Sequence, residues 1–211
     1  MMFALRRLLI AVVLAVTVYC LWPRTPSLTG FYPDRIAELQ VTAWRKTRSG
    51  QGWDLTRVLY STYAGQYGVG PVSALMMAND ESKALRIFQA APDAADQEKA
   101  LDPLVKVYVA LKSQVRGSFD AIAAAQMEFQ IWGLRAGNRS AELASAISEK
   151  LALLYGMSPD ELLPAAKKFA LSMKAADAGR WLESRQLSEE AWKTLQSLAK
   201  PPAPLKEDGS G

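Results

Sequence analysis

The sequence predicts an all-α protein, in which a short N-terminal membrane anchor helix precedes a bundle of about eight helices. Three observations lead to this prediction. No stretch alternates convincingly between apolar and polar residues with the period of two that marks a half-buried strand. Apolar residues instead recur at helical spacing after residue 32, and glycine and proline stand where helices would end or begin.

A second pattern is an apparent internal repeat. When the chain is shifted by 88 residues, ten identities occur among the 59 pairs from Phe31/Phe119 to Gln89/Asp177. We interpret this as a duplicated four-helix unit, with copies at 33–117 and 118–199 related by a pseudo-twofold axis. The repeated residues are predicted to be structural, and they are Phe31, Trp44, Tyr67, Gly68 and Pro71 in the first copy and Phe119, Trp132, Tyr155, Gly156 and Pro159 in the second.

The composition excludes several classes of site. The chain has 211 residues, half of them apolar, and its net charge of +4 comes from no long basic run. We therefore expect no nucleic-acid partner. Histidine is absent, which excludes histidine triads and histidine metal sites. The only cysteine, Cys20, lies in the hydrophobic segment, so an internal disulfide is excluded. We expect neither a metal nor a cofactor.

Residues 1–22 are predicted to form the anchor. The run Leu8–Trp22 contains no charged residue, and Arg6 and Arg7 precede it. Few positive charges follow the run, so the N-terminus is expected in the cytoplasm and residues 23–211 outside it. Bulky Tyr19 precedes Cys20, which fits neither an ordinary signal-peptide cleavage site nor a lipoprotein signal. We favour an uncleaved, single-pass anchor, which places the rest of the chain in the periplasm if the source is a Gram-negative bacterium.

A linker, residues 23–32, leads into the first copy. Its first helix is expected to begin at Pro33, a residue that suits the first helical position, and to end before Ser49. The second should span 53–67 and stop at Gly68, which suits the left-handed residue after a helix. A third helix is predicted at 71–89 and, after a looser stretch at 90–100, a fourth from Asp102.

The second copy is expected to repeat this order. Ser118 can cap a helix to residue 135, and a second helix should span 140–155. Ser158 and Glu161 have the spacing of a capping box and begin a helix to residue 176, with a bend near Pro164. The last helix is predicted to start at Ser188, and residues 200–211 are predicted to be a disordered tail.

Three residues are weak candidates for function. Trp44 and Trp132 could line a groove for a partner, although their helical spacing favours a place in the core. Glu128 precedes Trp132 by one helical turn, and a carboxyl group against an indole could act as a general acid. The first copy has Gln40 at the position of Glu128, which argues against a symmetric catalytic pair. We expect no cleft that holds two carboxylates about 5–9 Å apart.

The layout resembles a family of uncharacterised, membrane-anchored bacterial helical proteins. The resemblance rests on the short anchor, on Phe31-Tyr32-Pro33, on Glu38-Leu39 followed by Trp44, and on Tyr67-Gly68. It implies a topology and no activity. The leading hypothesis is therefore a membrane-tethered, extracytoplasmic, non-enzymatic module that binds another envelope protein. The alternatives are a carboxylate-dependent envelope hydrolase and a ligand-binding bundle with an apolar cavity.

Overall fold

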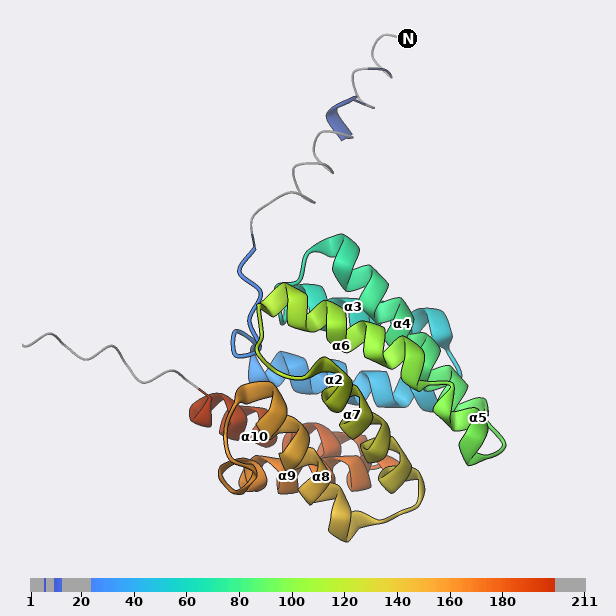
Figure 1. The fold of residues 1–211 in the computed structure, drawn as a ribbon, viewed down its shortest axis with the longest axis vertical. Helices are drawn as coiled ribbons and strands as arrows, with labels where there is room; N and C mark the ends of the chain where they lie inside the picture. Colours follow the sequence, from blue (N-terminus) through green and yellow to red (C-terminus); the bar gives the residue numbers. More distant parts are fainter. Residues whose placement is uncertain (1–5, 7–9, 13–23, 200–211) are drawn as a thin grey trace, which may run out of the picture.

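The computed structural model describes Arg6, residues 10–12 and residues 24–199, and this part of the chain is helical without a strand (Figure 1). An all-α fold is thereby confirmed. The helices, apart from the N-terminal segment, are α2 (Pro33–Arg48), α3 (Gly52–Gly65), α4 (Pro71–Ala90), α5 (Ala94–Glu98), α6 (Leu101–Val115), α7 (Ala121–Ala136), α8 (Ser140–Tyr155), α9 (Pro159–Asp177) and α10 (Trp181–Leu198).

The predicted anchor, residues 1–22, lies mostly outside the described residues, and so does the predicted tail, residues 200–211. Among the helices that are described, none combines the length and the apolar composition that crossing a bilayer requires.

Several predicted helix ends agree with the structure. Pro33 and Pro159 occupy the first helical positions of α2 and α9. Ser158 and Glu161 form the expected capping box, which satisfies backbone N–H groups that have no partner inside the helix. Gly68 and Gly156 have φ angles of 67° and 66°, which a residue with a β-carbon rarely adopts.

Other predictions were wrong in detail. A short additional helix, α5, occupies the stretch expected to be loose, because Asp93 accepts a hydrogen bond from the N–H of Asp96 and caps it. The cap of α7 is Asp120 rather than Ser118. The last helix starts at Trp181 and not at Ser188, directly after Gly179, whose φ of 74° ends the preceding turn.

The helices form a closed circuit. Each long helix packs against the next one in the chain, and α10 returns to pack against α2. Short connections between consecutive helices account for the first feature, since helices joined in this way become neighbours. The contact between α10 and α2 joins the two ends of the chain's helical part and depends on tertiary structure alone.

Two hydrophobic clusters divide the bundle into lobes. The first lobe gathers side chains of α3, α4 and α6, and the second gathers those of α8, α9 and α10. Helices α2 and α7 contribute to both, so they lie between the lobes, as Figure 1 shows. For example, Ala43 of α2 belongs to the first cluster, whereas Ile36 belongs to the second.

The helix bounds correspond at the same offset as the sequence identities. Helices α2 and α7 differ by 88 residues at both ends, and α3 and α8, like α4 and α9, differ by 88 residues at their first residue. The buried pairs Phe31/Phe119, Ala37/Ala125 and Ala78/Ala166 also correspond. In the first half α5 and α6 stand where the second half has the single helix α10.

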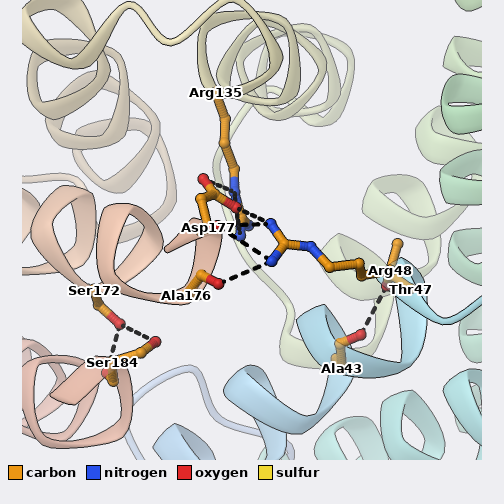
Figure 2. A network of polar contacts seen from close by, with 8 residues as sticks. All are labelled: Ala43, Thr47, Arg48, Arg135, Ser172, Ala176, Asp177 and Ser184. Carbon is orange, nitrogen blue, oxygen red and sulfur yellow. Dashed lines mark hydrogen bonds and ion pairs between the residues drawn. The ribbon is translucent and has the colours of Figure 1, made fainter. Parts of the chain in front are cut away.

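A polar network ties the two central helices to the second lobe (Figure 2). The carboxylate of Asp177, at the end of α9, accepts hydrogen bonds from Arg135 of α7 at 2.8–3.2 Å and from Arg48 of α2 at 3.1 Å. Arg48 also donates to the backbone carbonyls of Ala176 and Asp177 at 3.2–3.3 Å. The Ala176 carbonyl also accepts a hydrogen bond from the N–H of Gly179 at 3.0 Å, and Arg48 adds a positive charge at the C-terminal end of a helix that is distant in sequence.

Two tryptophans extend this network. The guanidinium of Arg135 lies 4.7 Å from the ring centre of Trp44, and that of Arg48 lies 5.7 Å from the ring centre of Trp181. Cations at such distances are attracted to the aromatic face. Together with Asp177, these four side chains connect α2, α7, α9 and α10 at one end of the bundle.

We predict that Asp177→Ala destabilises the protein by about 1–2 kcal/mol, because two arginines lose their shared charge-assisted hydrogen bonds. Urea unfolding followed by circular dichroism measures the effect. Glu38→Ala is a matched control, since the Glu38 side chain is 43% exposed against 39% for Asp177 but, within the described ranges, pairs with Arg35 of its own helix. Equal stability of the two variants would contradict the role assigned to the network.

Candidate functional site

The structure places the two candidate tryptophans at different kinds of position. Both are partly buried, Trp132 against the first hydrophobic cluster and Trp44 against the second. The ring of Trp132 contacts Phe88 with a centroid distance of 5.6 Å, and that of Trp44 lies under Arg135. Neither lines one of the two grooves described below. Their contacts are those of packing residues rather than of an open binding site.

Glu128 lies inside a polar cluster and its carboxylate is surrounded by donors. It accepts hydrogen bonds from Trp132 Nε1 at 2.8 Å and Lys150 Nζ at 2.5 Å, with a longer one from the Tyr108 hydroxyl at 3.4 Å. Burial alone would raise the pKa of Glu128, but the Lys150 charge and these donors outweigh it, so the pKa is lowered. A carboxyl group that stays ionised at neutral pH is a poor general acid.

Glu81, on α4, is a second acid of this cluster, and it was not singled out from the sequence. Its carboxylate accepts a hydrogen bond from the Tyr63 hydroxyl at 2.5 Å. Burial raises the pKa of Glu81 to about 7, and the charge of Glu128 adds to this, while the Tyr63 hydrogen bond and Lys150 oppose it. The charge of Glu128 therefore acts on Glu81 inside this cluster.

Three tyrosines complete the cluster. Tyr63 and Tyr67 come from α3 and the turn after it, and Tyr108 comes from α6. Burial raises the pKa of each, the nearby charge of Glu81 raises all three further, and the charge of Glu128 adds to the rise for Tyr67 and Tyr108. The tyrosines thus remain neutral donors, which is the state that two carboxylates in a partly buried site require.

The corresponding place in the second lobe has different chemistry. Gln40, which matches Glu128, accepts hydrogen bonds from Ser188 Oγ at 2.6 Å and Trp192 Nε1 at 2.9 Å. Phe169, which matches Glu81, packs its ring against that of Trp192. One lobe therefore holds two acids and a lysine where the other holds an amide and aromatic rings. At each of the two places, neighbouring side chains satisfy the hydrogen bonds of the polar groups. The two places do not form a symmetric catalytic pair.

A groove on the surface offers a different kind of site. It has a volume of about 340 Å³ and lies between α3 and α4. Its apolar walls include Trp53 and Tyr60 of α3 and Pro71, Val72 and Leu75 of α4. Thr56 and Arg57 of α3 supply its polar groups.

Large apolar side chains on this face are unusually exposed. Trp53 is 78% exposed, Val72 62%, Leu75 51% and Met76 63%. Other exposed apolar residues of the helices from α6 onward are spread over four helices, α6, α7, α9 and α10: Val109, Ile122, Leu171, Leu182 and Leu198. Single exposed apolar residues are ordinary on protein surfaces, whereas a group of them beside a groove is typical of a binding site.

A larger groove of about 570 Å³ lies at the end of the bundle where the linker crosses it. Its walls come from both halves of the chain and include the backbone of Pro26–Thr29, the end of α6, the α8–α9 turn and the end of α10. The Tyr155 hydroxyl donates to the Leu28 carbonyl at 3.0 Å, so the linker is fixed along this groove. Neither groove includes Glu81 or Glu128.

Sequence reasoning missed both Glu81 and the α3–α4 groove. Glu81 stands next to Asp80 in an ordinary run of polar residues, so nothing local distinguishes it. Trp53 carried a weak signal, because a tryptophan directly after the helix-breaking Ser49–Gly52 has no obvious core partner.

Comparison with known proteins gives no match, whether with family models, curated proteins or solved structures. In the described part of the chain, no group of three or more acidic or sulfur side chains gathers as metal ligands would.

We predict that Glu81 makes the protein less stable as the pH rises. Its pKa is raised in the folded state to about 7 from the ordinary 4.5, so the folded protein binds the extra proton between these values. The free energy of unfolding therefore falls from pH 4.5 to pH 7. Glu81→Gln should remove this contribution and stabilise the protein at pH 8 by on the order of 2 kcal/mol.

The measurement is the difference in unfolding free energy between Glu81→Gln and the unmodified protein at pH 5 and pH 8. Glu128→Gln is the comparison, because the pKa of Glu128 is lowered and its contribution to stability is present above its unfolded pKa. That variant should be less stable than the unmodified protein at pH 8. A difference for Glu81→Gln that does not change with pH would contradict the assignment.

Proposed function

We propose that this chain is a membrane-tethered helical module that binds another envelope protein through the α3–α4 groove. The observation that carries the proposal is the group of exposed apolar side chains beside this groove, Trp53, Val72, Leu75 and Met76. Leaving four such side chains in water has a free-energy cost that burial against a partner recovers, at about 25 cal/mol per Å² of apolar surface. Tryptophan is also enriched among the residues that dominate binding energy.

The groove belongs to stable helices rather than to a loop. Leu55 and Leu59 of α3 and Ala74 and Met77 of α4 are buried in the first hydrophobic cluster, so the opposite faces of these helices are fixed toward solvent. A binding surface held in this way loses little conformational entropy when a partner docks.

The alternatives receive less support. The hydrolase hypothesis named Glu128 as the acid, but its pKa is lowered and its oxygens are occupied by donors from α6, α7 and α8. The ligand-binding hypothesis called for an apolar cavity between the two halves. The groove that both halves line is open to solvent and is crossed by the linker backbone.

Two further parts of the proposal concern origin and location. The coincidence of helix bounds at the 88-residue offset supports descent of the two halves from one duplicated unit. The uncharged run Leu8–Trp22 supports a tether that keeps the helical module beside a membrane, on the extracytoplasmic side.

We predict that a photo-crosslinking amino acid at position 75 captures a protein partner in intact membranes. Trp53→Ala in the same chain should reduce the crosslinked product at least about tenfold, the ratio that a loss of 1.4 kcal/mol gives. Leu182→Ser is the matched control, because Leu182 is 72% exposed but lies on α10, away from the groove. Crosslinking that survives Trp53→Ala unchanged would remove the groove from the proposal.

A separate prediction concerns topology. Protease added outside spheroplasts of a bacterial host should digest the helical module, and detergent lysis should add little further digestion. Replacing Arg6 and Arg7 with glutamate and adding lysines after Arg24 should make the module resistant, because positively charged flanks favour the cytoplasmic side. Full protection of the unmodified chain would reverse the assigned orientation.

A further inference from the structure

The inference below rests on the proposed function and concerns the chemistry of the partner. Three basic side chains accompany the exposed apolar group. Arg57 is in the wall of the groove itself. Lys83 and Arg86 lie about two and three turns after Met76 along the exposed stripe of α4, since residues three and four apart share a helix face. A β-carbon on Gly52 would lie 3.4 Å from Arg86 Cδ, which places Arg86 beside the start of α3, next to Trp53.

These cations are not neutralised within the residues that the structure describes. The only side-chain hydrogen bond among them joins Arg86 Nε to the Ser82 carbonyl at 3.4 Å, and none of the three takes part in an ion pair. Arg57, Lys83 and Arg86 are all exposed. The surface therefore combines an apolar groove with a row of positive charges.

The acids on the same two helices make their direct contacts with other groups. Asp54 is paired with Lys46 of α2 at 2.7 Å, and its pKa is lowered first by Lys46 and, to a lesser extent, by the charge of Arg57. Asp80 lies toward α6, where the pKa of Lys106 is raised first by its hydrogen bond with Asp102 and, to a lesser extent, by the charge of Asp80. Glu81 is held by Tyr63 in the buried cluster. Positive charge on this face is thus left for a ligand from outside.

We infer that the partner presents an acidic amphipathic helix to this face. Its apolar edge, with side chains at helical spacing, fits the groove between α3 and α4, and carboxylates beside that edge meet Arg57, Lys83 and Arg86. This is the helix-in-groove mode of recognition, in which apolar anchors supply affinity and charged flanks supply specificity and speed of association. A concave groove suits inserted side chains better than the even surface of a bilayer.

The test uses the full chain in nanodiscs that hold one copy each. A displayed library of 18-residue helical peptides carries leucine at three positions of one edge, with glutamate, glutamine or lysine varied at the flanking positions. Binding to the unmodified protein should enrich glutamate over lysine at least about tenfold, which corresponds to 1.4 kcal/mol of charge interaction. Raising the salt concentration should reduce this enrichment, because exposed charges are screened.

The decisive variant reverses all three charges: Arg57→Glu, Lys83→Glu and Arg86→Glu. Lysine should then replace glutamate as the enriched flanking residue, while the leucine edge is retained. The matched control reverses three exposed cations on α9 and α10, Lys167→Glu, Lys174→Glu and Arg185→Glu, and should leave the preference for glutamate unchanged.

Each remaining outcome decides a separate point. A preference for glutamine at the flanking positions would overturn the inference of an acidic partner helix, and so would a preference for glutamate that survives the triple reversal. Either result would leave the groove as a binding site. Peptide binding that Trp53→Ala leaves intact, or no enrichment of any peptide, would overturn both the inference and the proposed function. Lipid adducts from a photo-crosslinker at position 75 in anionic nanodiscs, or crosslinked dimers in discs that hold two copies, would identify a different occupant and contradict the inference.

Discussion

The fold depends on two helices that must each bury opposite faces. Helices α2 and α7 belong to both hydrophobic clusters, so the lobes share them and cannot pack without them. Small residues make this possible, since Ala37 of α2 and Ala124 and Ala125 of α7 are fully buried and allow close approach of neighbouring helices. Arg48 and Arg135 then fix the ends of the same two helices to Asp177.

The buried polar cluster follows from the same arrangement. Once α7 faces the first lobe, Glu128 points toward α6 and α8, where Tyr108 and Lys150 satisfy it. Glu81 approaches from α4, and among the described residues its direct hydrogen-bond partner is Tyr63, so the desolvation of its charge is incompletely offset. One acid therefore contributes stability at neutral pH and the other reduces it. Such a cluster specifies how five helices meet, at some cost in stability.

The outer faces of α3 and α4 carry apolar side chains that stay exposed, unlike those on the inner faces. Their inner faces hold Leu55, Leu59 and Met77 against the first lobe, which leaves Trp53, Val72 and Leu75 without a partner in the bundle. The buried acids Glu81 and Glu128 line neither groove, so a partner would meet the outer faces of α3 and α4 and not these acids. The proposed binding function uses these apolar side chains and the unpaired cations beside them.

The sequence by itself determined the all-α class and most helix bounds, because these depend on neighbours along the chain. Pro33, Ser158 and Gly156 act within a few residues of their own position, so their effects can be read locally. The helix start at Trp181 was missed because Arg180 supplies no capping side chain. Only the tertiary structure decided that Glu81 lies near Glu128, 47 residues later, and that Arg48 meets Asp177. These contacts depend on how helices cross in space, which no local pattern encodes. The groove beside Trp53 has the same origin, since exposure of an apolar side chain is known only when every other helix has been placed.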